Sequence, residues 1–166
     1  MKKILLIIGV ATLFAACQKD FSVWKEYNEA ELKVYEANLG SNSSGIVEHW
    51  ISPSGLLVEV YHRGQTGIVP KLASYVYCEG WGKLVDDTRV QLLDPMRGFL
   101  VGSSSTIKGL QEILCQMPKG SWFRIYVPYE IGYGKDGDKA TNFHIPPYST
   151  LIFEIEIVDV FQNTPE

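Results

Sequence analysis

The chain has 166 residues, of which 46% are hydrophobic, 12% aromatic and 20% charged, and its formal net charge is −4. This length fits one domain of ordinary size with enough chain to bury a core. The aromatic content is too high for a disordered chain, and the acidic balance argues against nucleic acid as a partner, which would require a basic face.

The first sixteen residues have the layout of a secretory signal peptide. A positively charged start, residues 1–3, precedes a mostly apolar stretch, residues 4–16, which is too short to span a hydrocarbon core of about 30 Å. The segment Phe14-Ala15-Ala16-Cys17 resembles a bacterial lipobox. This resemblance implies that residues 1–16 are removed and that Cys17 is lipidated; an ordinary signal peptide with a chance cysteine is the alternative.

A lipobox places the protein in the bacterial cell envelope, held to the membrane by a lipid rather than by a spanning helix. Gln18, and not Asp, follows the cysteine. In enteric bacteria this favours sorting to the outer membrane, where the protein would face the periplasm.

Residues 17–45 are expected to comprise the lipidated cysteine, an N-terminal helix and a linker. Apolar residues near helical spacing predict a helix over Asp20–Asn38, with Asp20 or Ser22 as its cap. The stretch GSNSSG at 40–45 has the composition of a linker.

Residues 46–161 are expected to form one β-rich domain. Short apolar or alternating runs predict strands at Ile46–Ile51, Leu56–His62, Ala73–Glu79, Gly98–Val101, Trp122–Val127 and Leu151–Val160. One helix, Thr106–Met117, is indicated by an apolar stripe, with Ser104 or Ser105 as its cap. Strands with a single interposed helix indicate an α+β fold, in which an antiparallel sheet packs on that helix.

Common catalytic patterns are mostly missing from the sequence. His49, His62 and His144 lack the close spacing of metal ligands, so neither a metal site nor a cofactor is expected. Cys78 and Cys115 are either two buried free thiols, the favoured interpretation, or a disulfide in an oxidising compartment.

Three segments in the second half of the chain resemble the FKBP-type peptidyl-prolyl cis-trans isomerases. They are I-K-G-L…Q-M-P-K-G within residues 107–120, P-x-E-x-G-Y-G within 128–134, and I-P-P-x-S-T-L-I-F-E-I-E-I within 145–157. They occur in family order at near-family spacing, and the likeness extends over about residues 52–160. The resemblance implies a twisted antiparallel sheet curled around one short helix, with an apolar ligand cavity between them.

The family pattern also implies a set of site residues in this chain. Ile107, Tyr133 and Phe153 match the catalytic positions of the family. Ile145 matches a substrate-binding position, and Leu110 stands on the cavity floor where the best-known members have Trp.

The same alignment shows where the chain departs from the family. Cys78 stands where the pocket tyrosine belongs, and Val90-Gln91 falls near the family's Phe-Asp pair. The loss of an aromatic phenol, an aromatic ring and a carboxylate together favours weak activity or a changed ligand.

Three functions remain open at this point. The first is a lipid-anchored isomerase acting on X-Pro bonds of envelope proteins, and the second is a catalytically weak module that binds peptides or a partner protein. The third is a structural lipoprotein with a vestigial pocket. The N-terminal helix either forms a homodimer, as in some members of the family, or serves as a stalk.

Overall fold

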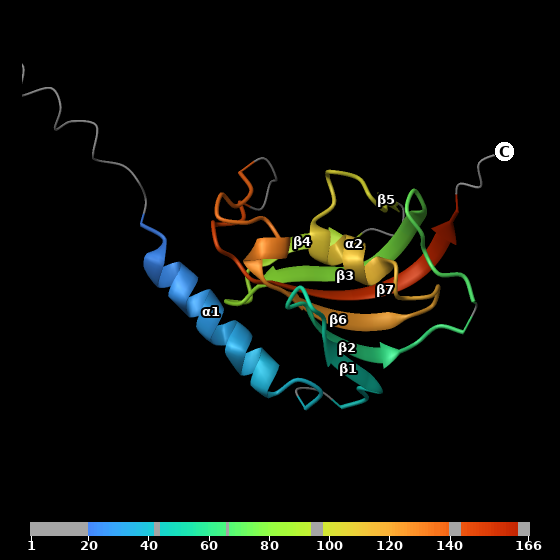
Figure 1. The fold of residues 1–166 in the computed structure, drawn as a ribbon, viewed down its shortest axis with the longest axis horizontal. Coiled ribbons are helices and arrows are strands. Elements are labelled where there is room, and N and C mark those ends of the chain that lie inside the picture. Colours follow the sequence, from blue (N-terminus) through green and yellow to red (C-terminus); the bar gives the residue numbers. More distant parts are fainter. Residues whose placement is uncertain (1–19, 42–43, 66, 94–97, 140–143, 163–166) are drawn as a thin grey trace, which may run out of the picture.

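The computed structural model describes residues 20–41, 44–65, 67–93, 98–139 and 144–162 (Figure 1). The proposed signal peptide and Cys17 lie outside these residues. The helices are α1 (Ser22–Ala37) and α2 (Lys108–Leu114), with a 3₁₀ turn at Tyr129–Ile131. The strands are β1 (Glu48–Ile51), β2 (Leu57–His62), β3 (Tyr75–Leu84), β4 (Arg89–Leu93), β5 (Phe99–Leu100), β6 (Trp122–Val127) and β7 (Leu151–Phe161).

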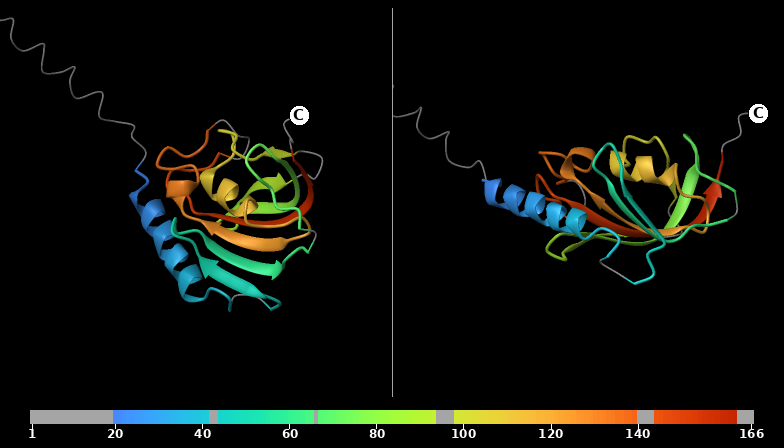
Figure 2. Two further views of the ribbon diagram at one scale, coloured as in Figure 1. Left: turned by 45° about the vertical axis from the view of Figure 1, so that its right-hand side comes forward. Right: turned by 60° about the horizontal axis from the view of Figure 1, so that its bottom comes forward.

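The strands form one antiparallel sheet in the order β1-β2-β6-β7-β3-β4, with β5 paired to β3. The sheet is strongly curved and α2 lies inside the curve (Figure 2). The expected α+β fold is therefore confirmed.

Alternation along β7 assigns its side chains to the two faces of the sheet. Leu151, Phe153, Ile155 and Ile157 are each at most 1% exposed and join the core beneath α2. Ile152 points to the opposite face, where it forms a second apolar cluster with Leu57 and Tyr126.

The second cluster receives α1. Leu32, Tyr35 and Leu39 pack against it, and the Tyr35 ring stacks on Tyr126 with centroids 4.5 Å apart. The helix therefore lies against its own sheet, instead of projecting as a stalk, on the face opposite α2.

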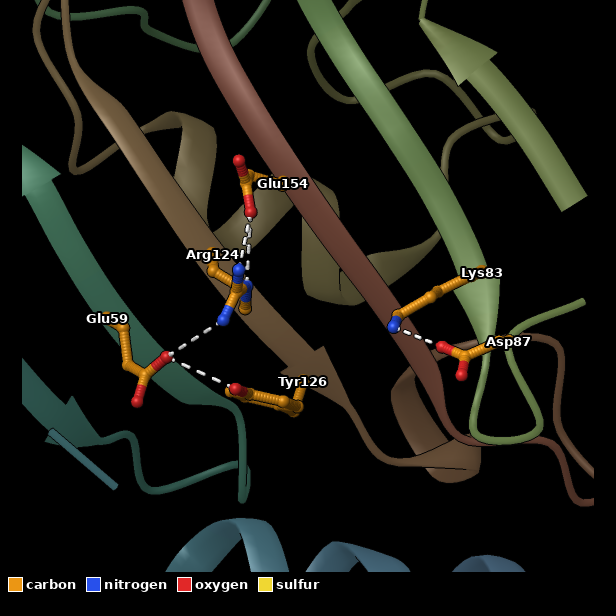
Figure 3. A network of polar contacts seen from close by, with 6 residues as sticks. All are labelled: Glu59, Lys83, Asp87, Arg124, Tyr126 and Glu154. Atoms are coloured by element: carbon orange, nitrogen blue, oxygen red, sulfur yellow. Dashed lines mark hydrogen bonds and ion pairs between the residues drawn. The ribbon is translucent and has the colours of Figure 1, made fainter. Parts of the chain in front are cut away.

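A polar network anchors the chain just beyond α1 to the same face (Figure 3). The Glu59 carboxylate, fully buried, accepts hydrogen bonds from the Gly40 N–H (3.0 Å) and the Tyr126 hydroxyl (3.1 Å). The Arg124 guanidinium lies 3.9 Å from Glu59 and 2.7 Å from Glu154. The end of the helical arm is thus tied to strands β2, β6 and β7.

Several predicted boundaries were wrong. The strand predicted at Ala73–Glu79 runs on to Leu84, and β4 was not predicted at all. The predicted helix Thr106–Met117 shortens to α2, which is preceded by Ile107 in extended conformation with no side-chain cap, so neither Ser104 nor Ser105 caps it.

The start of α1 also differs from the prediction. The residue before the helix is Phe21, and the Asp20 carboxylate accepts a hydrogen bond from the Ser22 N–H at 2.9 Å. Asp20 therefore satisfies a free donor of the first turn from one position further out than a standard cap.

A glycine permits the close packing of α2 on the sheet. A Cβ atom at Gly109 would lie 2.6 Å from Cγ1 of Val127, which is too close for any side chain. The first turn of α2 therefore rests directly on β6, and this contact fixes the position of Ile107 relative to the end of that strand.

Candidate functional site

A cavity of about 420 Å³ lies where the chain enters α2. One wall comes from the residues that lead into the helix, and the other comes from the segment that follows β6. The lining residues are Ser104, Ser105, Thr106, Ile107, Lys108, Glu130, Gly132, Tyr133 and Gly134.

Two hydrogen-bond donors of this cavity have no partner within the described residues. They are the backbone N–H of Ile107 and the hydroxyl of Tyr133. Burial and the Asp138 carboxylate raise the pKa of Tyr133, so its hydroxyl stays protonated at neutral pH. Both groups can therefore donate to the carbonyl oxygens of a bound ligand.

An apolar cluster lies beneath the two donors. Ile107 and Tyr133 pack against the core, whose members include Leu110, Ile145 and Phe153 at 1–5% exposure. Of the five family-matched residues, Ile107 and Tyr133 line the cavity, whereas Leu110, Ile145 and Phe153 belong to the buried core on which those two pack and are not among the lining residues.

The place of Ile145 is fixed by a short antiparallel bridge. Its N–H donates to the Asp138 carbonyl at 2.9 Å, and its carbonyl accepts from the Asp138 N–H at 2.8 Å. This bridge ties Ile145, a member of the core cluster, to the segment that follows Tyr133.

The substituted positions also lie in the core. Cys78 and Val90 are 1% and 2% exposed and belong to the same cluster. Gln91 pairs through its backbone with Gly82, and its side chain lies outside the described part. At these two positions β3 and β4 therefore contribute small core side chains, a cysteine and a valine, and neither is among the residues that line the cavity.

Cys78 is not a nucleophile in this setting. Burial raises the pKa of its thiol to about 12, so the thiolate is almost absent at neutral pH. Cys115 is exposed, and both residues are free thiols. The favoured interpretation of two free thiols is confirmed, although Cys115 is not buried.

Sequence reasoning missed two contributions to the site. Lys108 and Glu130 place opposite charges on the cavity lining, and Trp24 of α1 packs against the same core as Ile107 and Tyr133. Trp24 followed a helical pattern in the sequence, but the pattern did not indicate which part of the domain it would contact.

No group of three or more His, Cys, Asp or Glu that could hold a metal ion occurs among the described residues. Within the same residues, no helix is long and apolar enough to cross a membrane.

Comparison with known families agrees with this arrangement. The family model described as FKBP-type peptidyl-prolyl cis-trans isomerase matches residues 71–158, a little over half of the chain. The protein belongs to this family. The matched region contains every family-matched site residue, from Ile107 to Phe153, whereas α1 lies outside it.

Relatives in the FKBP-type family extend the likeness. The chain is 35% identical over 111 residues to the FKBP-type 22 kDa peptidyl-prolyl cis-trans isomerase of Escherichia coli, with 64% of this chain and 50% of the relative covered. It is 32% identical over 151 residues to the outer membrane protein MIP of Legionella longbeachae, with 89% and 60% covered.

A solved structure shows the same fold. The crystal structure of FkpA from Escherichia coli superposes with a TM-score of 0.70 at 28% identity, and 86% of this chain and 63% of that one are covered. The chain therefore spans about half to just under two thirds of the length of these relatives.

Proposed function

We propose that the protein is a peptidyl-prolyl cis-trans isomerase that acts on X-Pro bonds of polypeptides in the bacterial cell envelope. The observation that supports this most directly is the pair of unpartnered donors, Ile107 N–H and Tyr133 hydroxyl, at the edge of an apolar cluster containing Phe153.

The chemistry follows from the electronic structure of the amide. Rotation about an X-Pro bond meets a barrier of about 18–20 kcal/mol because amide resonance is lost in the twisted state. The twisted amide is less dipolar than the planar one, so an apolar surface stabilises it better than water does. A thousandfold acceleration needs about 4 kcal/mol of such differential stabilisation.

Each residue then has a defined part. The Ile107 N–H and the Tyr133 hydroxyl hold carbonyl oxygens of the substrate, while Phe153 and Ile145 enclose the prolyl ring. No covalent bond is made or broken, so the site requires neither a nucleophile nor an acid–base pair.

Activity is tested by cis/trans relaxation of X-Pro peptides with the full-length protein in mild detergent. We expect catalysis in the wild type and a two- to tenfold lower kcat/KM in Tyr133→Phe, about the worth of one hydrogen bond. Tyr75→Phe, which changes a tyrosine that is 41% exposed on β3, is the matched control and is expected to be silent.

The small buried side chains at Cys78 and Val90, where the family pattern has aromatic residues, support a second candidate, a peptide-binding module with weak catalysis. A wild-type relaxation rate equal to the uncatalysed rate at micromolar protein would refute the enzyme. Retained binding of the same peptides would then support the binding module, and loss of both would refute both functions.

A lipid on Cys17 would hold this isomerase at the membrane. The lipobox-like sequence supports the anchor, and Gln18 together with a relative named as an outer membrane protein supports the outer membrane, facing the periplasm. Cys17→Ser is expected to move the protein from the membrane fraction to the soluble fraction. A variant that stays in the membrane fraction would show that the anchor lies elsewhere.

The exposed side of α1 supports a homodimer. Five apolar residues alternate at spacings of four and three on this side, which is the pattern of a helix-pairing seam: Val23, Tyr27, Ala30, Val34 and Ala37. An antiparallel pair that crosses at Ala30 would set Glu26 of each helix beside Lys33 of the other.

The antiparallel arrangement is tested by cross-linking in membranes. Ala30→Cys is expected to give a covalent dimer on mild oxidation, because the two-fold axis brings the introduced thiols together. Ala37→Cys should give no more than the wild type, since the other end of the partner helix would face it. Equal cross-linking of both variants would indicate a parallel pair, and none would argue against this interface.

A further inference from the structure

A polar side chain of α1 is completely buried against the domain. Asn28 is 0% exposed, and its Oδ1 accepts the N–H of Thr150 at 2.7 Å while its Nδ2 donates to the carbonyl of Trp24 at 2.8 Å. Thr150 is itself 1% exposed. The helix therefore supplies the acceptor for a buried backbone donor at the start of β7, a donor that would be costly to leave unpaired.

A second contact comes from the same side of α1, one turn earlier. Trp24 donates from Nε1 to the Ser149 hydroxyl at 3.1 Å, and Ser149 in turn donates to the carbonyl of Pro146 at 2.7 Å. Two residues four positions apart on the helix thus hold two consecutive residues of one turn, Pro146–Thr150.

This turn is strained. Tyr148 has φ = 61°, in the left-handed region that a bulky side chain rarely occupies. Such a conformation persists only where the surroundings impose it. The Tyr148 ring meets Tyr129 edge-on at 5.2 Å, and the Lys25 ammonium of α1 lies 5.9 Å from the same ring.

The strained turn is connected to the cavity on both sides. Its first residue directly follows Ile145. The Tyr148 N–H donates to the carbonyl of Gly134 at 3.0 Å, and Gly134 lines the cavity next to Tyr133. A shift of the turn would therefore displace both Ile145, which belongs to the core on which Ile107 packs, and the segment that carries the Tyr133 hydroxyl.

We propose that Asn28 and Trp24 are positioning residues of the isomerase site, which hold the Pro146–Thr150 turn in its strained conformation. Neither residue lies within the region matched by the family model, which begins at residue 71. The inference rests on the proposed isomerase activity and adds to it that the N-terminal helix is a working part of the site.

The test compares full-length variants in mild detergent, at a temperature where each is folded by circular dichroism. Asn28→Ala is expected to lower kcat/KM about tenfold, since small displacements of positioning groups cost rate steeply. Trp24→Phe, which removes the indole N–H, is expected to lower it about threefold. Asn38→Ala, an exposed asparagine of the same helical arm, and Trp122→Phe are matched controls and are expected to be silent.

Two readouts separate positioning from a loss of stability alone. Trp24→Phe and Ser149→Ala both remove the bond between Trp24 and Ser149, and Ser149→Ala also removes the bond to Pro146. The double variant should therefore be no slower than Ser149→Ala alone. The N–H groups of Tyr148 and Gly134 donate to the carbonyls of Gly134 and Tyr129. Exchange of these two amides should be at least tenfold faster in Asn28→Ala and unchanged in Asn38→Ala.

Folded Asn28→Ala with a kcat/KM within twofold of the wild type would overturn the proposal. If Asn28→Ala does not fold, the rates of Trp24→Phe and Ser149→Ala test the proposal instead. Unchanged kcat/KM in both variants would overturn the proposal. A wild type without catalysis would instead refute the proposed function. In that case the positioning role is tested by measuring the affinity of each variant for a Leu-Pro tetrapeptide. Equal affinity in the wild type and Trp24→Phe would overturn the positioning role.

Discussion

Phe153→Ala is expected to reduce isomerase activity at least a hundredfold and to lower the free energy of unfolding by about 3–5 kcal/mol. The ring is 1% exposed and lies near the start of β7, opposite Ile125 on β6 and Gly82 on β3. Truncation would leave a cavity between sheet and α2, at the surface that is proposed to receive the prolyl ring. Denaturant titration measures the stability, and peptide relaxation under folding conditions measures the rate.

Phe153→Leu separates the role of the ring from the cost of the cavity. It keeps most of the apolar volume, so we expect it to lose less stability than Phe153→Ala while retaining a clear rate defect. Phe123→Leu is the matched control. Phe123 lies near the start of β6, on the same face of the sheet as Phe153, and it is equally buried. Equal activity in the two leucine variants would argue against a catalytic role for Phe153.

The strands predicted best were those with one buried face. In β7 the alternation of apolar and acidic residues follows the alternation of buried and exposed positions, so the sequence pattern predicts this strand directly. The strand predicted at Ala73–Glu79 ended before Gly80, because glycine is unfavourable inside a strand. The structure supplies the reason for Gly80: a Cβ there would lie 1.9 Å from the carbonyl oxygen of Glu154, so the close approach of β3 and β7 requires glycine.

Two cavity residues, Ile107 and Tyr133, were predictable from the sequence because they lie in short motifs. Ile107, Tyr133 and Phe153 fall within three segments of family-like sequence, and the fold brings those segments together. The contribution of α1 was not predictable. In sequence Asn28 looks like a polar residue on a solvated helix face, and its partner is a backbone N–H 122 positions away, which leaves no side-chain signal.

The largest purely structural effect is expected at Glu59. Glu59→Ala should lower the free energy of unfolding by about 3–5 kcal/mol, because it removes a fully buried carboxylate on which two donors and a guanidinium converge. Arg124 would keep Glu154, but the Tyr126 hydroxyl and the Gly40 N–H would lose their acceptor. Burial raises the pKa of Tyr126 to about 12, so its hydroxyl is a donor throughout the neutral range.

The same substitution distinguishes two ways in which α1 is held on the sheet. If the carboxylate anchors the end of the arm, the Gly40 amide should exchange much faster in Glu59→Ala, and thermal unfolding should begin at a lower temperature. Glu156→Ala, on the same face but exposed, is the control and should change the free energy of unfolding by less than about 0.5 kcal/mol. A Glu59→Ala protein as stable as this control would mean that stacking of Tyr35 on Tyr126 and the apolar contacts of Leu32 and Leu39 hold the helix without the buried charge.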